Sequence, residues 1–425
     1  MNLPANHPQR VRLNDEVHAR PPEPLSAPCR MSYLALLCDA AQREASFQAV
    51  VTLATTCGVA PPEPGASHYS ADLFAFRLKW ERHTEFVRYT FMVASGSEDP
   101  FERTALAAVP PDWIAALPGA LMVAAHLVLV QDDGADPAAL GQRLFAREVL
   151  VGSGVTDGAA AAFTDFRIYP DGFSRLLVQD HGMTPWQAGR VCQRLLEIDT
   201  YRVMALLALP VAQALAPEVA RGEQELARIT AAMVTANEAD DPTLLDRLTR
   251  LAAEVDSRLS DNLYRFSAAA AYEGIVHSRI AELRERRIAG LQTLQEFTER
   301  RLTPAMNTCR SAASRQEELS RRVARTTQLL ATRVGVTRER QSQEQLAVMN
   351  RRVKIQLRLQ STVEGLSVAA VTYYVSALVG RLAEGLHTVG LSVRPAVAEA
   401  VAVPIVALVV WIAVRRIHRM VARDV

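Results

Sequence analysis

Apolar and polar residues alternate along much of the first part of the chain, which predicts β-strands. The segment DLFAFRLKWERHTEFVRYTFMVA, residues 72–94, alternates on both sides of residues 81–83, as a β-hairpin does. The continuously apolar run GALMVAAHLVLV at residues 119–130 predicts a buried central strand. SYLALL at residues 32–37 predicts a first strand of the same sheet.

A second hairpin and two helices complete this part of the chain. FTDFRIYPDGFSRLLVQ predicts a hairpin that turns at residues 170–172. Helices are expected at residues 44–57 and 111–117. Residues 31–183 therefore predict a cytoplasmic α/β domain, preceded at residues 1–30 by an arm whose repeated prolines exclude regular helix.

Helical periodicity dominates after residue 183. Thr184 before Pro185 is an N-cap followed by proline at the first helical position. Further helices are expected to begin near Pro217 and at Asp241, the second of them running for about 60 residues. Thr303-Pro304 gives the next start signal, so residues 184–303 predict a helical domain and residues 304–362 a long stalk helix.

Heptad spacing along the stalk helix predicts that it packs against other helices. A first seam holds Leu319, Val323, Leu330 and Val334, and a second stretch holds Leu346, Met349 and Val353. A single helix of this length is not stable when water surrounds it. We therefore expect both the preceding helices and other copies of the chain as partners, so that the protein is a homo-oligomer.

Two apolar segments follow the stalk, each long enough to cross a bilayer. They occupy residues 363–382 and 396–414, and about 20 residues at 1.5 Å each span roughly 30 Å of hydrocarbon. Their carboxylates, Glu364 and Glu399, lie near the segment ends. The sequence thus predicts a transmembrane hairpin with an extracytoplasmic loop at residues 383–395, although a pair of buried core helices remains the alternative.

Basic residues flank the hairpin on one side. Arg351, Arg352, Lys354 and Arg358 precede the first segment, and the tail at residues 415–425 adds Arg415, Arg416, Arg419 and Arg423. The excess of Lys and Arg marks the cytoplasmic side of a membrane protein. We therefore expect a multi-pass membrane protein with both termini in the cytoplasm and the lipid bilayer as a partner.

Composition excludes several other classes of protein. A formal net charge of +1 provides no overall attraction to nucleic acid. The five cysteines are scattered without zinc-site spacing, and a cytoplasmic setting keeps thiols reduced. The first 30 residues have no apolar h-region and so predict no signal peptide.

The sequence predicts neither catalytic residues nor a bound cofactor. Walker A, dinucleotide-binding, HExxH and GxSxG motifs are absent, so no enzyme activity is expected. VGSGVTDG at residues 151–158 lacks the lysine of a phosphate-binding loop, and Asp132-Asp133-Gly134 is typical of a turn more than of a cation site. A divalent cation remains a possible ligand of the protein, at residues that the sequence does not identify.

A cluster of polar residues in the N-terminal arm is one candidate site. Its members are Asn14, Asp15, Glu16, His18 and Arg20. These side chains have the chemistry to hold a metal ion or a phosphate. The alternative is a loop fixed to the domain by hydrogen bonds and ion pairs.

A stripe on the first apolar segment is the second candidate site. Gly365, Ala369, Thr372, Ser376 and Gly380 follow helical spacing, with Glu364 at their start. Small residues let transmembrane helices approach closely, while Thr and Ser hydrogen-bond across the contact. The same stripe is compatible with a water-filled pore, in which Glu364 would form a ring of carboxylates that attracts cations.

Four segments of the chain carry a family resemblance: LNDEVHARPPEPLSAPCR, LLEIDTYRVMALLALP, FTERRLTPAMNTC and VKIQLRLQSTVEGLSVAAVTYYVSALVG. They resemble the signature segments of a bacterial family of predicted membrane-anchored proteins of unknown function. The resemblance extends from the N-terminus to the first apolar segment. It implies a membrane anchor and supplies no reaction, cofactor or catalytic residue.

The order of elements resembles that of CorA-type magnesium channels. An N-terminal α/β domain, a long stalk helix, two spans with a short loop and a basic tail occur in that order. The resemblance implies a pentamer whose first span lines a pore. The Gly-Met-Asn motif of that family is absent, and the place after the first span reads VGRLAEGLHTVG, so the resemblance concerns architecture and not the transported ion.

Two functions follow from these predictions. One is a CorA-like homo-oligomer of the inner membrane that conducts or senses cations. The other is a non-conducting anchor that presents an α/β and coiled-coil module to partners.

Overall fold

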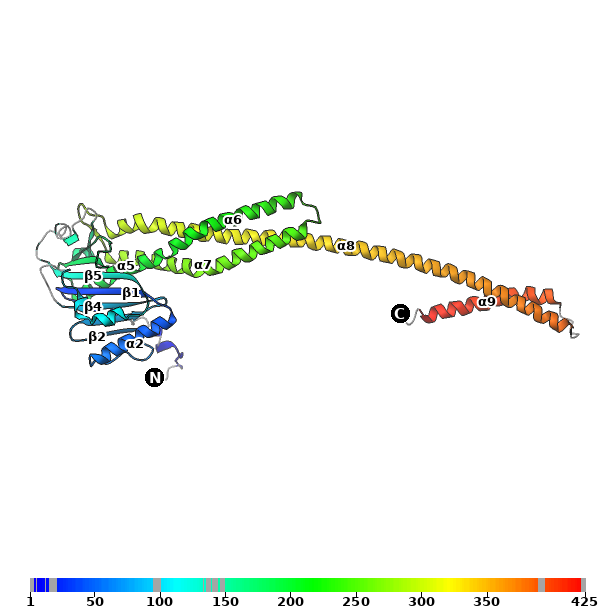
Figure 1. Cartoon of the computed structure of the whole chain (residues 1–425), viewed down its shortest axis with the longest axis horizontal. Coiled ribbons are helices and arrows are strands. Elements are labelled where there is room, and N and C mark those ends of the chain that lie inside the picture. Colours follow the sequence, from blue (N-terminus) through cyan, green and yellow to red (C-terminus); the bar gives the residue numbers. More distant parts are fainter. Residues whose placement is uncertain are drawn as a thin grey trace. The chain divides into compact units, whose positions relative to one another are not determined.

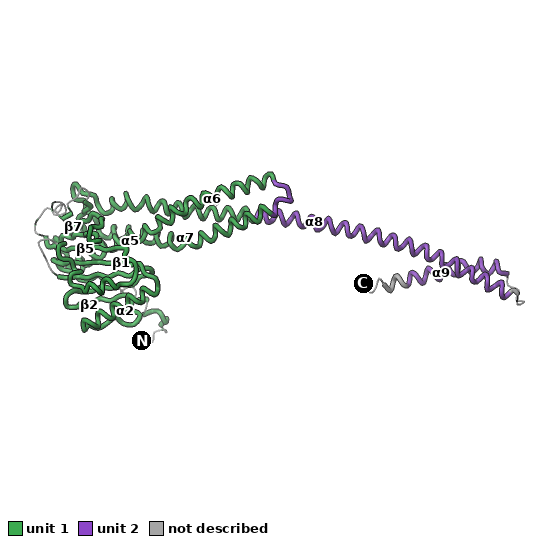
Figure 2. Tube along the Cα trace, in the orientation of Figure 1, with its two compact units in different colours: residues 1–235, 243–327 green, residues 236–242, 328–425 purple. Residues whose placement is uncertain are grey.

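The chain combines a mixed β-sheet with long helices. The structure, a computed structural model, describes residues 4, 6–11, 13–14, 21–94, 101–132, 134, 139, 144–145, 150–388 and 394–421. The chain divides into two compact units, the first formed by residues 1–235 and 243–327 and the second by residues 236–242 and 328–425 (Figure 2). An α+β fold with an N-terminal sheet and long C-terminal helices is therefore confirmed (Figure 1).

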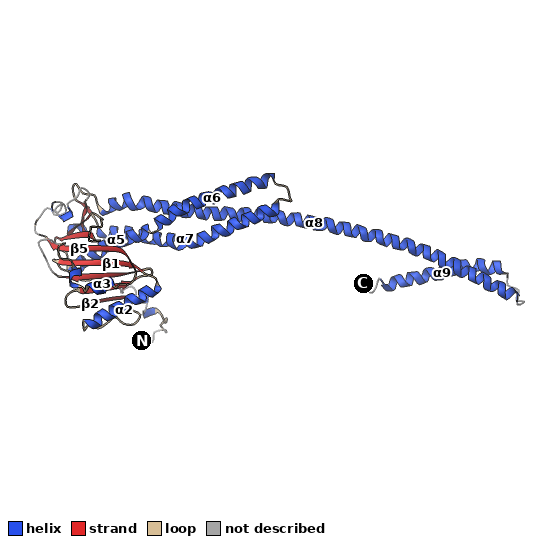
Figure 3. Ribbon diagram, viewed as in Figure 1, coloured by secondary structure: helices blue, strands red, loops and turns tan. Residues whose placement is uncertain are grey.

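Strands from the first 180 residues, with one short later strand, form a single sheet (Figure 3). The order along it is β2-β3-β4-β1-β5-β8-β7-β6-β9, in which β5 and β8 are parallel and the other pairs are antiparallel. The strands are β1 (Cys29–Leu37), β2 (His68–Asp72), β3 (Arg77–Arg82), β4 (Phe86–Val93), β5 (Ala120–Gln131), β6 (Val151–Val155), β7 (Ala160–Thr164), β8 (Ser174–Asp180) and β9 (Arg286–Arg287). Both predicted hairpins and the buried central strand are confirmed.

Helix α2 (Ala40–Thr56) covers one face of the sheet. Asp39 caps it, because its side chain accepts a hydrogen bond from the Gln42 amide while the Gln42 side chain accepts one from the Asp39 amide. Alternate strand residues, such as Leu78 and Trp80, point to this face. They form a buried apolar core with Phe47 and its neighbours on α2. The short helix α3 (Pro111–Ala115) adds Trp113 to that core.

Helix α5 (Pro185–Leu206) covers the opposite face. Thr184 caps it with Pro185 at the first helical position, as the sequence predicts. Tyr33 on β1 hydrogen-bonds to Thr200 of α5 across a distance of 2.8 Å. The sheet therefore lies between two helical layers, and side chains from alternate strand positions belong to different interfaces.

The predicted start of α6 and the predicted end of α7 are wrong. Helix α6 (Ala208–Thr235) begins directly after α5 and continues through Pro217. Helix α7 (Asp241–Leu283) ends long before residue 303, and the chain then turns through Arg284 and Gly290, both with positive φ, on either side of β9. Glycine adopts such backbone angles at little cost.

The long helix α8 (Leu294–Thr388) begins ten residues earlier than the predicted start at Pro304. Thr293 and Glu296 form the capping interaction, in which the Thr293 amide donates to Glu296 and the Glu296 amide donates to the Thr293 hydroxyl. Glu285 accepts from the next two amides, those of Leu294 and Gln295. Pro304 lies inside the helix, about three turns beyond Thr293.

The first two residues of the first heptad seam of α8 pack within the first unit. Leu319 and Val323 are buried, and Leu319 lies against Gly222 of α6. Arg315 pairs with Glu223 of α6 at 2.7 Å, and Ser320 donates to Asp256 of α7 at 2.8 Å. The prediction that preceding helices fold back onto the stalk helix is therefore confirmed for the part of the seam at Leu319 and Val323.

The second unit contains the rest of α8 and helix α9 (Pro395–Val421). Among the described residues, three helical stretches are long and apolar enough to cross a membrane by length and composition: Pro185–Thr235, Leu294–Leu386 and Pro395–Arg416. The first of them includes α5, which packs on the sheet through buried side chains. The other two contain the apolar segments that the sequence identifies.

Candidate functional site

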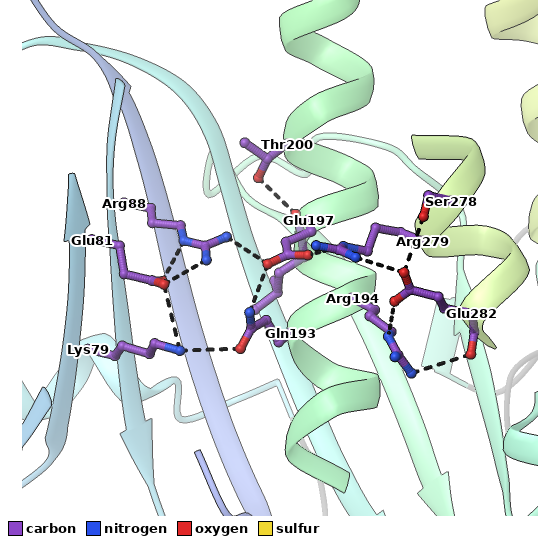
Figure 4. Close-up of polar contacts among 11 residues, drawn as sticks. Lys79, Glu81, Arg88, Gln193, Arg194, Glu197, Thr200, Ser278, Arg279 and Glu282 are labelled. Carbon is purple, nitrogen blue, oxygen red and sulfur yellow. Dashed lines mark hydrogen bonds and ion pairs between the residues drawn. The ribbon is translucent and has the colours of Figure 1, made fainter. Parts of the chain in front are cut away.

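A buried network of charged side chains connects the sheet to α5 (Figure 4). Arg88 of β4 donates two hydrogen bonds to Glu81 of β3, at 2.5 and 2.8 Å, which is the paired geometry that guanidinium and carboxylate groups favour. The same guanidinium donates to Glu197 of α5 at 3.2 Å. All three side chains are buried. Burial alone disfavours the charged guanidinium, but Glu81 and Glu197 outweigh it and keep the pKa of Arg88 above its ordinary value.

Helix α7 extends the network on the far side of α5. Arg279 donates to the second oxygen of Glu197 at 2.5 Å and to Glu282 at 2.9 Å. Arg194 of α5 pairs with Glu282 at 2.8 Å. Glu197 therefore accepts from Arg88 and from Arg279, so that it joins three layers of the first unit (Figure 4).

Lys79 lies at the other end of the network, beneath the N-terminal arm. Its ammonium donates to the carbonyl of Pro21 at 2.7 Å and to Gln193 at 3.2 Å, and it lies 3.7 Å from Glu81. Burial lowers the pKa of Lys79, while the nearby Glu81 opposes that shift.

The arm itself is fixed against α5. Leu25 is buried, and its amide donates to the carbonyl of Pro185 at 3.0 Å. The backbone of Glu23 lies so close to Gly189 that a Cβ at Gly189 would be 1.7 Å from the Glu23 carbonyl oxygen. Only glycine permits this approach.

A further buried carboxylate, Glu85, holds α7 near the β3–β4 turn. Glu85 accepts from Arg265 at 2.7 Å and from the hydroxyls of Tyr272 at 2.7 Å and Tyr264 at 3.3 Å. Burial on its own raises the pKa of Glu85, but these hydrogen bonds outweigh it and hold the pKa below its ordinary value. The pKa of Glu197 is lowered in the same way, by Arg88, Gln193 and Arg279 acting against burial.

Stability is expected to fall as the medium is acidified. A carboxylate whose pKa is lower in the folded state stabilises the fold above its ordinary pKa of about 4.3, and this contribution is lost as pH falls through the folded value. We expect Glu85→Gln to be less stable than wild type at pH 7 and to lose less stability than wild type between pH 7 and pH 3. The measurement is the urea midpoint of the full chain in detergent at each pH. The exposed Glu317→Gln is the control, and identical pH curves for Glu85→Gln and wild type would contradict the prediction.

The predicted small-residue stripe is divided between two environments. Ser376 and Gly380 are buried and Thr372 is half-buried, whereas Gly365 and Ala369 are exposed. A Cβ at Gly380 would lie 3.1 Å from a carboxylate oxygen of Glu399 on α9. The C-terminal half of the stripe therefore packs against α9 within the same chain. Glu364 is half-buried, one turn from Gln360, whose amide donates to it at 3.3 Å.

Other sequence candidates are placed as follows. Asn14 is exposed, while Asp15, Glu16, His18 and Arg20 lie outside the described residues. Asp132 accepts from the Gly134 amide at 2.9 Å and so forms a turn, and Asp133 is outside the described residues. Residues 151–158 form β6 and the short 3-10 helix after it. Within the described ranges, no group of three or more His, Cys, Asp or Glu side chains is arranged to hold a metal ion.

Sequence reasoning missed the charged network. Its strand members Lys79 and Glu81 occupy the polar positions of an alternating strand, a pattern that usually faces water. The available signal was that α5 also carries Gln193 and Glu197 one turn apart on a helix with a broad apolar face. The network joins the sheet, α5 and α7 through paired charges, and each of its charged side chains on a strand has a partner within the network.

One comparison with known proteins gave a match. The family model described as Protein of unknown function (DUF3422) matches residues 5–421. No curated protein and no solved structure matched the chain. The comparisons thus give no support to the architectural likeness with CorA-type channels.

Proposed function

The chain belongs to the DUF3422 family of proteins of unknown function, and we propose that it is a membrane-anchored scaffold. In this proposal the hairpin formed by the end of α8 and by α9 spans the bacterial inner membrane. Both termini are cytoplasmic, and the sheet and its helical layers are presented to partners in the cytoplasm.

The apolar surface of the hairpin carries this proposal. Ser376, Gly380 and Ala383 of α8 and Ala402 of α9 are buried, so the small side chains lie at the helix contact. The large apolar side chains point away from it, among them Val371, Tyr373, Tyr374, Leu378 and Leu382 on α8 and Val401, Ile405, Leu408, Val409 and Ile412 on α9. Water disfavours a continuous apolar surface of this extent, whereas lipid accommodates it. Contact through small residues is how transmembrane helices pack.

Residues at the hairpin ends suit the membrane interface. The Arg415 guanidinium lies 4.8 Å from the ring centre of Trp411, which places a cation and an amphipathic ring together where α9 leaves its apolar stretch. Tryptophan and arginine are enriched at the boundaries of membrane spans. Four basic residues also precede the first apolar segment, so they support a stalk on the same side of the membrane as the basic C-terminal tail, the cytoplasmic side.

A scaffold is favoured over an enzyme by the pairing of the buried charges. Lys79, Arg88 and Arg279 each contact a carboxylate or an amide of the same network. Charges that are satisfied in this way stabilise a fixed arrangement of layers. We propose that the domain acts as a rigid body that partners recognise.

Cation conduction is the second candidate. The face of α8 opposite the α9 contact carries Gln356 and Gln360 before the first apolar segment and Ser367 within it, and polar groups of this kind suit the entrance to a water-filled path. It has less support, because Ser376 and Gly380 are occupied by α9. A pore that uses the whole predicted stripe would require α9 to leave it.

Arginine substitutions on the outer hairpin surface test the anchor. Leu378 and Leu408 are exposed, so Leu378→Arg with Leu408→Arg would be harmless in water, whereas each arginine in hydrocarbon is strongly unfavourable. We expect the double variant to lose most of the membrane fraction that resists alkaline carbonate. The matched control changes two exposed apolar residues of the first unit, Val234→Arg with Leu263→Arg, and should remain in the membrane.

Two further outcomes decide between the candidates. Retention of the Leu378→Arg and Leu408→Arg variant in the carbonate-resistant fraction would overturn the anchor. Wild-type protein reconstituted in liposomes is expected to pass no cations in a fluorescent flux assay. A cation-selective flux would replace the scaffold proposal with conduction.

A further inference from the structure

Three cations form a row on the exposed part of α8 that precedes the first apolar segment. Residues 341–363 are exposed on every side of the helix. Arg351, Lys354 and Arg358 follow one another at intervals of three and four residues, and side chains at that spacing lie on the same face of a helix. We call these three side chains the basic row. Arg352 adds a fourth cation on another side of the helix.

The charge of the basic row is not balanced within the chain. No Asp or Glu occurs between Glu344 and Glu364. In the part of the chain that the structure describes, none of the three cations forms an ion pair, whereas Arg340, earlier on the same helix, pairs with Glu238 at 2.7 Å. Like charges one turn apart repel each other. An anionic partner would therefore stabilise this stretch.

In the proposed anchor, the basic row ends where phospholipid headgroups begin. Arg358 precedes Val363, the start of the first apolar segment, by about 7.5 Å along the helix. The headgroup layer extends about 5–7 Å beyond the hydrocarbon on each side, so the long side chain of Arg358 reaches the phosphate groups. Lys354 and Arg351 lie about 13 Å and 18 Å from Val363, and their charges act over a screening length of about 8 Å.

The same helix face continues from the basic row into the first apolar segment. Gly365 and Ala369 lie on this face, seven and eleven residues after Arg358. Both are exposed, and a Cβ at Gly365 would lie within 4 Å of no atom of the described residues. Further along the face, Gly380 is covered by Glu399 of α9. The uncovered part of the face therefore presents cations and then small apolar residues, the order in which a phospholipid presents its phosphate and its acyl chains.

We propose that the basic row binds anionic phospholipids, with the phosphate at Arg358 and Lys354 and an acyl chain against Gly365 and Ala369. The inference rests on the proposed function, in which the hairpin spans the membrane. Clusters of Lys and Arg beside the cytoplasmic end of a span attract anionic lipids, and each cation near the surface changes the affinity about fivefold. Nucleic acid or an acidic peptide would match the charges but not the apolar surface beyond them, whereas a lipid matches both.

Native mass spectrometry of the full chain, taken from vesicles with equal amounts of phosphatidylglycerol and phosphatidylcholine, tests the proposal. Wild type, released in mild detergent, is expected to retain at least about five times more phosphatidylglycerol than phosphatidylcholine. Arg351→Gln with Lys354→Gln and Arg358→Gln should retain the two lipids nearly equally. Among the single variants, Arg358→Gln should lose most of the preference and Arg351→Gln least, because Arg351 lies farthest from the headgroups.

The matched control neutralises three other cations of α8. Arg322, Arg325 and Arg338 are exposed and form no ion pair within the described residues. They lie at least about 37 Å before Val363, which is several screening lengths. Arg322→Gln with Arg325→Gln and Arg338→Gln should therefore keep the wild-type lipid ratio. Equal far-ultraviolet circular dichroism would show that both sets of substitutions leave the fold intact.

Two results would overturn the proposal: equal retention of the two lipids by wild type, or an unchanged ratio in the variant without the basic row. Nucleic acid or protein bound in place of phosphatidylglycerol would overturn it as well. A chain that does not enter the vesicles contradicts the anchor itself. A chain that enters them and retains both lipids equally contradicts only this inference.

Discussion

Replacing Arg88 by methionine is expected to lower the free energy of unfolding by about 3–5 kcal/mol. Arg88 is the cation between two buried carboxylates, Glu81 and Glu197, which it contacts at 2.5 and 3.2 Å. Methionine fills similar space but leaves Glu81 without its paired donor and leaves Glu197 with Arg279 and Gln193. Removing one partner of a buried ion pair is costly, because Glu81 has lost its hydration and keeps only Lys79, at 3.7 Å, as a nearby cation.

Urea unfolding of the full chain, followed by circular dichroism in detergent, measures this effect. Arg321→Met is the matched control, since Arg321 forms exposed pairs with Glu317 and Glu318 on α8. Exposed pairs of this kind contribute about 0–1 kcal/mol, so the control should unfold close to wild type. Equal losses for Arg88→Met and Arg321→Met would show that the buried network does not stabilise the fold.

Gly189→Ala is expected to detach the N-terminal arm from α5. The added methyl group would sit 1.7 Å from the Glu23 carbonyl oxygen, and a backbone atom has no rotamer with which to avoid it. Detachment exposes Leu25, worth about 1.5–3 kcal/mol. It also breaks the contacts of Pro21 with Lys79 and of Leu25 with Pro185, each worth about 0.5–1.5 kcal/mol. The expected loss of stability is thus about 2.5–6 kcal/mol.

Hydrogen exchange separates local detachment from general unfolding. The Leu25 amide, which donates to the Pro185 carbonyl in the wild type, should lose protection in Gly189→Ala while the central strand β5 keeps it. Gly274→Ala is the control, because it lies in α7 with open space around it and alanine favours helix. Unchanged protection of Leu25 in Gly189→Ala would contradict the prediction.

Local sequence patterns predicted the sheet well because each strand is defined by its own residues. Alternation identified β3 and β4, and the uninterrupted apolar run identified β5, which lies between β1 and β8 inside the sheet. Thr184-Pro185 marked the start of α5 for the same local reason. The start of α8 was misplaced because Thr303-Pro304 resembles a cap, whereas the interaction between Thr293 and Glu296 forms the actual one.

Local sequence patterns could not predict the charged network. Arg88 and Glu197 are 109 residues apart in the chain, and the sequence around either residue does not show that the two are in contact. The polar positions of β3 and β4 have the same alternation whether water or α5 covers them. The sequence of the small-residue stripe could not identify its neighbour, because α9 and another copy of the chain would select the same small residues.

Glu197 has a mechanical consequence for the first unit. Its two oxygens accept from Arg88 on the sheet and from Arg279 on α7, and an apolar contact at the same place would allow the layers to slide. Directional hydrogen bonds resist such shear, since a small displacement lengthens both at once. A pull applied along α7 is therefore carried into β4 through Glu197 and into the β3–β4 turn through Glu85, so we expect the sheet and α7 to move together.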